Sequence, residues 1–477
     1  MSKADSIQSR GDEAHETSLL RSARYGATVA VLSVLALAGC DRELILPGDR
    51  FDVRTPLADT NDPANSLGDA TVEADETAEL VAEVEREAVA IRLPATRNLT
   101  SWTHRNGSNQ HRTEHPALAP SLTEVWRTGI GAGDSRKHRI TASPVAGGGR
   151  IYTLDSRAKV TGMDLATGDI VWQRDLSPPR DRSDDASGGG LTLGGDTLYV
   201  TSAFGTITAL DAASGNVKWT QALDAPANAA PTVDGNRVYV VSTDAVARAI
   251  DTRTGKVEWL LAGAPNVSSL TGGAGPIIDG RNVVLPLPSG ELISVLKQTG
   301  IRVWGTSVAG ERVGRAYSIF SGITGDPVLV GNTIYTSSPQ GKTVAIDAET
   351  GDREWTANEG AYGPVWPVGG SLFLISDEAR LVRLNARTGE AVWAEQLPYF
   401  EHSRPRRHRE IHAHFGPILA GGRLLVASDD GLMRSFDPAS GAQVSSTEIP
   451  GGAATAPIVI NGTAYVVSTN GILYAFR

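Results

Sequence analysis

An eleven-residue unit recurs along this chain and restricts the fold more than any other feature of the sequence. Its clearest copy, residues 249–259 (AIDTRTGKVEW), places an Asp and a Thr-Gly pair between two stretches of β-favouring residues. The Asp and Thr side chains can bond nearby backbone amides and the Gly can adopt a positive φ, so each copy predicts a tight β-hairpin. The other copies, of which the last two are weaker, are residues 162–172, 209–219, 345–355, 383–393, 295–304 and 435–445.

The spacing of the copies predicts a ring of small sheets. Their turn glycines lie 38 to 52 residues apart, which is close to the roughly 40 to 50 residues of a four-stranded propeller blade. A second pattern, a pair of apolar strands, occurs eight times, so one hairpin is missing. We expect residues 122–126 (LTEVW) to supply the missing outer strand beside the C-terminal strand 472–476, because a closed ring protects the sheet edges.

The predicted fold class is therefore all-β: an eight-bladed β-propeller of four-stranded antiparallel blades over residues 95–477. The large Trp on the return strand of each hairpin must be buried, and a neighbouring copy of the unit can cover it. The repeated Asp residues are assigned a structural role, since Lys297 and Asn385 replace two of them. The predicted blade-docking residues are Trp126, Trp172, Trp219, Trp259, Trp304, Trp355 and Trp393.

The first 40 residues have the pattern of an exported lipoprotein. Arg21 and Arg24 precede an apolar run over residues 27–37, which ends in Leu-Ala-Gly-Cys and is too short for a permanent membrane span. The ending resembles a bacterial lipobox, which predicts a signal peptide of residues 1–39 and lipidation of Cys40. The alternative is a short buried helix with an incidental Cys. Because Cys40 is the single cysteine, we expect no disulfide and no thiolate metal site in the mature domain.

Residues 40–94 are predicted to form a tether. Between residues 41 and 90 the sequence has 14 Asp and Glu against 4 Arg, a net charge of −10 that equals the formal charge of the whole chain. Up to about residue 66 the composition is typical of disorder. Leu80, Val84 and Ala88 then recur at helical spacing. They indicate either a solvated linker helix or a helix that docks on a partner.

Two segments of the sequence are rich in histidine and are candidate binding sites. His104, His111 and His115 lie in a predicted loop without a carboxylate or thiolate spaced as a further ligand, so we expect no metal site. Residues 401–414 combine four Arg with several His. That segment is either a solvated inter-blade loop or a contact for an anionic lipid head group or an acidic partner. Nucleic-acid binding is not expected, because the propeller carries no broad basic field.

Catalytic signatures do not occur in the sequence. It lacks a full Gly-x-x-x-x-Gly-Lys-Ser/Thr phosphate loop, a Gly-x-Ser-x-Gly elbow and a His-Glu-x-x-His pair. We therefore assign no catalytic residues and expect a protein that is not an enzyme.

The repeats resemble those of the pyrroloquinoline-quinone (PQQ) dehydrogenases, whose eight-bladed propellers interlock through such tryptophans. With the lipobox and a single propeller of this length, the chain is similar to the BamB family of outer-membrane assembly lipoproteins. The resemblance implies a scaffold without cofactor, anchored by lipid at the periplasmic face of the outer membrane. We expect a monomer within a larger complex. Its implied partners are the periplasmic domains of BamA and other subunits of the β-barrel assembly machinery. Asp41, after the lipidated Cys, leaves an inner-membrane location open.

The resemblance also implies where a partner binds. The BamA contact of the family corresponds to two inter-blade loops, here residues 268–273 and 312–326. Thr271 stands where the family has an Arg, and its paired acidic positions fall near Gly322 and Thr324. The alternative is that these side chains only pack the loops. The candidate partner-binding residues are Leu270, Thr271, Arg315, Tyr317 and Phe320.

Two other functions remain open at this point. A periplasmic ligand- or glycan-binding propeller would need aromatic and polar groups that converge in its central funnel, with Trp102 or Trp366 as candidates. A PQQ-dependent dehydrogenase would share the fold, but those enzymes generally carry a vicinal cysteine pair and a calcium site. The single cysteine argues against that activity.

Overall fold

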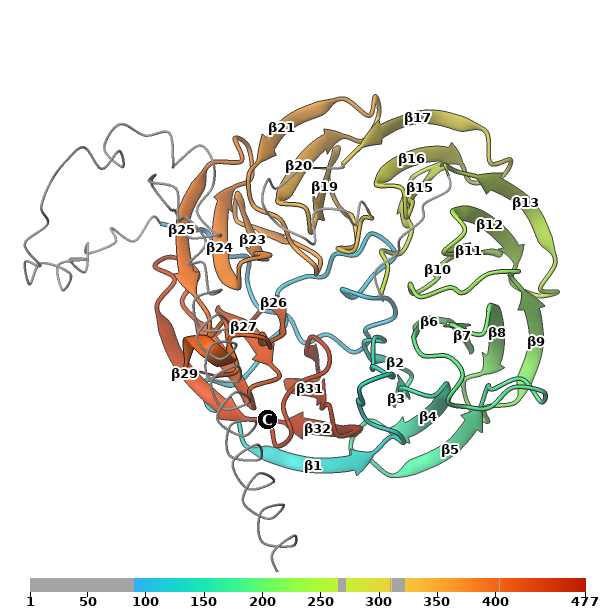
Figure 1. The fold of residues 1–477 in the computed structure, drawn as a ribbon, viewed down its shortest axis with the longest axis horizontal. Helices are drawn as coiled ribbons and strands as arrows, with labels where there is room; N and C mark the ends of the chain where they lie inside the picture. Colours follow the sequence, from blue (N-terminus) through green and yellow to red (C-terminus); the bar gives the residue numbers. More distant parts are fainter. Residues whose placement is uncertain (1–89, 265–271, 309, 311–321, 403) are drawn as a thin grey trace, which may run out of the picture. The chain divides into compact units, whose positions relative to one another are not determined.

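Eight four-stranded antiparallel sheets form a closed ring in the computed structural model (Figure 1). The structure describes residues 90–264, 272–308, 310, 322–402 and 404–477. One sheet joins the two ends of the propeller, because β1 (Glu124–Gly129) pairs with β32 (Ile472–Phe476) in antiparallel register, with Thr128 opposite Leu473. The predicted propeller, its eight blades and its closure by an N-terminal strand are confirmed.

Each blade runs from a short inner strand to an outer strand on the rim. Blades 1 to 4 comprise β2 (Val145–Gly147), β3 (Arg150–Leu154), β4 (Lys159–Asp164), β5 (Ile170–Asp175); β6 (Gly189–Gly194), β7 (Thr197–Ser202), β8 (Thr206–Asp211), β9 (Val217–Ala222); β10 (Thr232–Asp234), β11 (Arg237–Val241), β12 (Val246–Asp251), β13 (Val257–Ala262); and β14 (Ile277–Asp279), β15 (Asn282–Pro286), β16 (Glu291–Leu296), β17 (Arg302–Ser307).

Blades 5 to 8 follow the same order. They comprise β18 (Val328–Val330), β19 (Thr333–Ser338), β20 (Lys342–Asp347), β21 (Arg353–Ala357); β22 (Trp366–Val368), β23 (Ser371–Ile375), β24 (Arg380–Asn385), β25 (Ala391–Gln396); β26 (His414–Ala420), β27 (Arg423–Ser428), β28 (Leu432–Phe436), β29 (Gln443–Glu448); and β30 (Ile458–Ile460), β31 (Thr463–Val467), β32 and β1. A 3₁₀ turn, η4 (Pro405–Arg407), lies between β25 and β26. Within the described ranges no helix is long and apolar enough to cross a membrane.

The hairpin turns and the tryptophans form the contacts between blades. Trp172 on β5 lies against Gly215 in the turn of the next blade, and its indole N–H donates a hydrogen bond to the Ala212 carbonyl at 3.0 Å. In the same turn, Asp211 accepts hydrogen bonds from the Ser214 hydroxyl and amide, which lower the pKa of its carboxyl group. The same Trp–Gly contact occurs in the pairs Trp126–Gly168, Trp219–Gly255, Trp259–Gly300, Trp304–Gly351, Trp355–Gly389 and Trp393–Gly441.

The eighth interface, between blades 7 and 8, is built differently. The hairpin of blade 7 has Ser445 where the others have Trp, and blade 8 has no hairpin turn there because its two outer strands come from opposite ends of the chain. Leu118 and Phe476 instead join an apolar cluster with side chains of β27 and β31. The backbones of Thr123 and Arg477 exchange two hydrogen bonds of 2.9 Å. Blade 7 therefore lacks the Trp at the one interface where blade 8 lacks the turn glycine that the Trp would contact.

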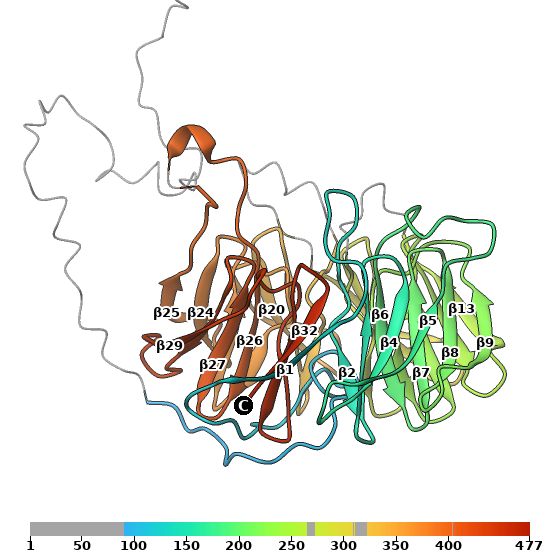
Figure 2. The same ribbon diagram turned by 90° about the horizontal axis from the view of Figure 1, so that it is seen from below.

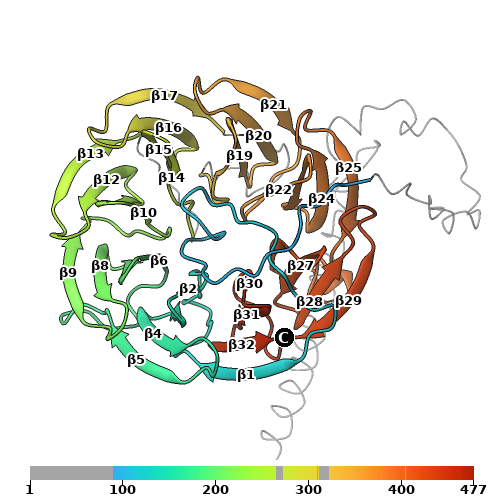
Figure 3. The same ribbon diagram turned by 180° about the vertical axis from the view of Figure 1, so that it is seen from behind.

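Residues 91–121 cross one face of the ring (blue in Figures 2 and 3). The segment has little regular structure, yet its backbone hydrogen-bonds to the inner strands or turns of most blades. These contacts join Trp102 to Ala146, Thr103 to Leu193, Asn109 to Ile278, Gln110 to Leu329, Pro116 to Gly421 and Leu99 to Asn461. We call this side the closed face. The opposite side, where each outer strand leads into the next blade, is the loop face.

The three histidines of this segment are buried and attach it to the ring through hydrogen bonds. His104 accepts a hydrogen bond from the Val233 amide through Nε2 at 3.3 Å, while its Nδ1 lies 2.9 Å from the Thr103 hydroxyl. His115 Nδ1 lies 2.8 Å from the Pro94 carbonyl, and its Nε2 accepts from the Gly422 amide at 2.8 Å. Burial, reinforced by His111, lowers the pKa of His104 to about 3. The ring is therefore neutral at physiological pH.

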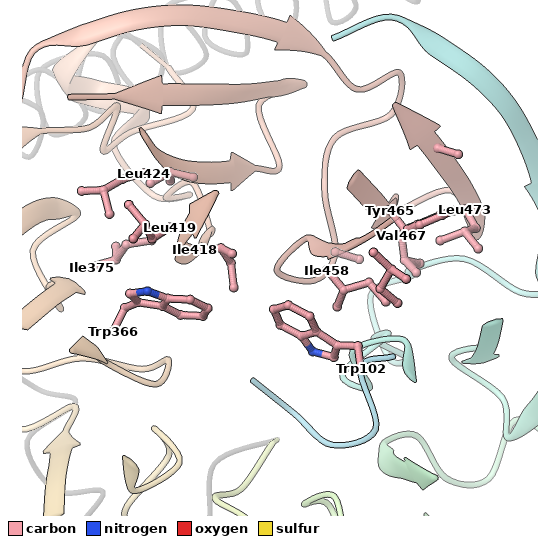
Figure 4. Packing of buried hydrophobic residues seen from close by; sticks show 14 of the residues in the cluster. Trp102, Trp366, Ile375, Ile418, Leu419, Leu424, Ile458, Tyr465, Val467 and Leu473 are labelled. Carbon is pink, nitrogen blue, oxygen red and sulfur yellow. The ribbon is translucent and has the colours of Figure 1, made fainter. Parts of the chain in front are cut away.

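Trp102 and Trp366 stack on each other beside the inner strands (Figure 4). Their ring centroids are 6.5 Å apart, with an angle of 20° between the planes. Both belong to the largest apolar cluster, which includes Ile375, Ile418 and Ile458, and only 1% and 6% of their surfaces are exposed. The pair fastens the N-terminal segment to blade 6.

The turn glycines test the contact between blades. A Cβ placed on Gly215 would lie 2.5 Å from the Trp172 ring, whereas a Cβ on Gly195 in the same blade would meet nothing within 4 Å. Both residues have a positive φ, of 72° and 61°, so both Gly→Ala changes carry the cost of that backbone conformation. We expect Gly215→Ala to lower the free energy of unfolding in urea by about 1–3 kcal/mol more than Gly195→Ala. Equal losses would contradict the packing role.

The neutral His104 predicts a dependence of stability on pH. Its pKa is about 3 in the folded protein and 6.5 in the reference state, so the unfolded chain binds the extra proton as the pH falls below 6.5. From pH 7 to pH 5 this linkage should remove about 2 kcal/mol of unfolding free energy. In urea titrations at several pH values, the His104→Gln variant should not show this loss of about 2 kcal/mol. The control is His402→Gln, the same substitution at an exposed position.

Candidate functional site

The loop face carries a hollow. It has a volume of about 570 Å³ and lies among inter-blade connections and the turns between second and third strands. Arg139, Tyr362 and Phe415 contribute to its wall, together with Arg105 from the N-terminal segment.

A buried ion pair lies beside this hollow. Arg105 Nε is 3.0 Å from Asp326 Oδ2, and its Nη1 donates to the Gly273 carbonyl at 3.0 Å. The Asp326 side chain is fully buried and also accepts from the Gly275 amide. The pair links the N-terminal segment to the connections that precede β14 and β18. It holds the described ends of those two connections in place, since removing one partner of a buried pair leaves an uncompensated charge.

A small apolar depression lies between the same two connections. Its volume is about 50 Å³, and its lining includes Ala229, Val241, Pro286 and Ile323. Gly272 and Gly322, the first described residues after two gaps, also contribute to it. A pocket of this kind can receive an apolar side chain of a partner.

The basic segment forms a hairpin, residues 398–402 and 404–413, that rises from the loop face and has η4 at its tip (orange in the upper part of Figure 2). An antiparallel bridge joins Phe400 to Ile411 near its base. The ring of His408 stacks on Phe400 with 3.8 Å between centroids. Arg406 and Arg407 lie in η4 and are exposed. The hairpin is thus an ordered, positively charged projection.

Comparison with known proteins assigns the family. The family model described as "Outer membrane protein assembly factor BamB" matches residues 119–187, 157–395 and 401–477, which is every blade of the propeller. The chain belongs to the BamB family.

Two relatives support this membership. BamB of Aliivibrio fischeri is 39% identical over 361 residues, which cover 74% of this chain and 89% of that protein. BamB of Pseudomonas aeruginosa is 37% identical over 241 residues, or 50% of this chain. In that second comparison the chain spans 61% of the relative's length, which is less than two thirds.

Solved structures share the fold. The crystal structure of BamB from Moraxella catarrhalis has a TM-score of 0.62 and 21% identity, and the match covers 75% of this chain and all of that one. Quinohemoprotein alcohol dehydrogenase from Comamonas testosteroni has a TM-score of 0.61 and 16% identity, with 79% and 80% covered. At these identities both comparisons establish the propeller and not an activity.

Several sites predicted from the sequence lie outside the described residues of this BamB-family chain. They are the lipidation site Cys40 and the partner-binding candidates Leu270, Thr271, Arg315, Tyr317 and Phe320. The connections that contain the last five start and finish on the loop face, because β13 and β17 end there and β14 and β18 begin there.

The two extra tryptophans do not form an open aromatic platform. Trp102 and Trp366 are buried against each other in the core, so neither presents a free ring face on which a sugar could stack. The Arg105–Asp326 pair could not be found from the sequence, because 221 residues separate its members and neither has a local motif. The folded ring alone brings them together.

Proposed function

We propose that this chain is a scaffold subunit of the β-barrel assembly machinery, that it has no enzymatic activity, and that it binds BamA. The observation that carries the proposal is the BamB family match, which extends over all eight blades. The curated relatives from Pseudomonas, Alteromonas and Aliivibrio are all named outer membrane protein assembly factors. By this proposal the chain assists the folding and insertion of outer-membrane β-barrel proteins.

We further propose the loop face as the partner-binding side. The N-terminal segment already occupies the closed face with backbone hydrogen bonds. The apolar depression near Ile323 and the buried Arg105–Asp326 pair lie next to the two connections that the family resemblance implicates. A preformed depression supported by a fixed ion pair suits an interface hot spot. Leu270 and Arg315 are the proposed anchors on these connections.

The membrane anchor is part of the same proposal. The apolar run and the Leu-Ala-Gly-Cys ending support cleavage after residue 39 and lipidation of Cys40. Residues 40–94 would then be a tether between the lipid and the propeller, at the periplasmic face of the outer membrane. Labelled palmitate should enter the wild-type protein and not a Cys40→Ser variant.

A pull-down tests the partner and its site together. Lipidated protein, crosslinked in its native envelope and purified, should recover BamA and its companions by mass spectrometry. The double variant Leu270→Glu and Arg315→Glu should reduce BamA recovery at least tenfold, because interface hot spots contribute about 2 kcal/mol or more each.

The chain offers a matched control for that experiment. Leu260, 64% exposed on the rim strand β13, and Arg253, exposed in a turn of the closed face, lie outside the proposed interface. Leu260→Glu with Arg253→Glu makes the same charge changes and should leave recovery unchanged. Recovery of BamA with the first double variant at the wild-type level would refute the site. Recovery of inner-membrane proteins alone would refute the scaffold proposal.

The scaffold proposal and the dehydrogenase alternative predict opposite outcomes of a cofactor test, and we expect the outcome of the scaffold proposal. Purified protein incubated with PQQ and calcium should show neither bound quinone absorbance nor reduction of an electron-accepting dye. We expect this because the mature domain has no cysteine apart from the proposed anchor. Dye reduction above a control with heat-unfolded protein would establish an enzyme instead.

A further inference from the structure

A cluster of three metal-ligating side chains lies at the base of the basic hairpin. Glu401, His412 and Asp429 each place one ligand atom within 4.8 Å of the others. Glu401 and His412 come from the two arms of the hairpin, and Asp429 comes from the turn after β27. We propose that these residues form a binding site for a borderline divalent transition-metal ion, with Zn²⁺ as the ion of choice.

Backbone contacts hold the three residues in their positions. The Glu401 amide donates to the Glu410 carbonyl at 3.1 Å, and the His412 amide donates to the Tyr399 carbonyl at 2.9 Å. The Asp429 amide donates to the Ala413 carbonyl at 3.0 Å. These bonds fix the backbone positions from which the three side chains extend, two on the hairpin and one on blade 7. A tetrahedral zinc site keeps its ligand atoms roughly 3.4 Å apart, a spacing that small side-chain rotations can reach here.

Asp429 differs from its counterpart in the neighbouring blade. Asp377 occupies the same turn position in blade 6, where it is buried and accepts a hydrogen bond from the Gly360 amide. Asp429 is more exposed and accepts from His412 Nδ1 instead, at 2.8 Å. The Asp429 carboxylate therefore faces a second potential ligand, the His412 imidazole, in place of a loop amide.

His412 also differs from the hairpin's neighbouring histidine. Both ring nitrogens of His414 are engaged, with the Ser428 hydroxyl at 2.7 Å and the Pro398 carbonyl at 2.8 Å. Burial lowers the pKa of His414. Among the described residues His412 makes one side-chain hydrogen bond, between Nδ1 and Asp429, so an ion bound between these two groups would displace a single hydrogen bond. A neutral imidazole with two carboxylates suits zinc and similar ions better than Mg²⁺ or Ca²⁺, which take oxygen ligands alone.

The site has room for further ligands. Glu401 and Asp429 both line the 570 Å³ hollow of the loop face. Three protein ligands leave at least one coordination position open to water or to a group of a partner. The arginines of the hairpin are exposed, so solvent and salt screen their charge. A bound ion would tie the hairpin to blade 7 and fix its orientation over the hollow.

Zinc binding to the full mature chain, without a histidine tag and stripped with chelator, tests the proposal. Isothermal titration with ZnCl₂ should show one site, and Co²⁺ should give visible absorption bands of a low-symmetry site. Zn²⁺ should also slow tryptic cleavage at the arginines of the hairpin.

Single changes of the ligands decide the assignment. Glu401→Gln, His412→Gln and Asp429→Asn should each weaken zinc binding roughly tenfold or more and abolish the protection from trypsin. Glu410→Gln removes an exposed carboxylate of the same hairpin that is not a ligand, and should leave both readouts unchanged. Wild-type binding weaker than about 100 μM, or equal affinity in the ligand variants and the wild type, would overturn the site. BamA recovery is measured separately, so failure here leaves the scaffold proposal standing.

Discussion

The contact between a rim tryptophan and a turn glycine is the interaction on which the rest of this propeller depends. A single four-stranded blade cannot bury its faces, so it is stable only when it packs on its neighbours. Each Trp covers the glycine of the next turn, and a Cβ there would approach the ring to within 2.5 to 2.9 Å. In five of the pairs the indole N–H also donates to a carbonyl of that turn. One repeated unit thus sets both the local hairpin and the distance between blades.

The two ends of the propeller segment complete blade 8 and its interface with blade 7, which the repeats do not supply. β1 closes blade 8, and the apolar cluster of Leu118 and Phe476 replaces the Trp–Gly contact at that interface. The preceding segment then crosses the closed face, where three buried histidines and Trp102 attach it to inner strands from both halves of the ring. As a result, the two faces differ. One is crossed by the chain's own N-terminal segment, and the other carries the connections between blades and the basic hairpin.

That difference gives the loop face its proposed functions. The buried Arg105–Asp326 pair connects the closed-face segment to the connections that border the apolar depression. The proposed metal site lies at the base of the hairpin and borders the same hollow as Arg105. Both features use parts of the chain that are not repeated, whereas the repeated Asp, Gly and Trp residues serve the fold. The proposed functions therefore depend on parts of the chain that depart from the repeat.

The sequence by itself determined the architecture. The Asp-x-x-Thr/Ser-Gly turns, the period of 38 to 52 residues and the unmatched Trp126 predicted eight blades and their closure, because these signals are local and repeated. It predicted residues 95–121 as a loop, but their path across the closed face and the burial of His104, His111 and His115 depend on contacts with distant blades. Nor could the sequence bring Arg105 to Asp326, or Glu401 and His412 to Asp429. Such pairs have no period to detect, and only the closed ring places them side by side.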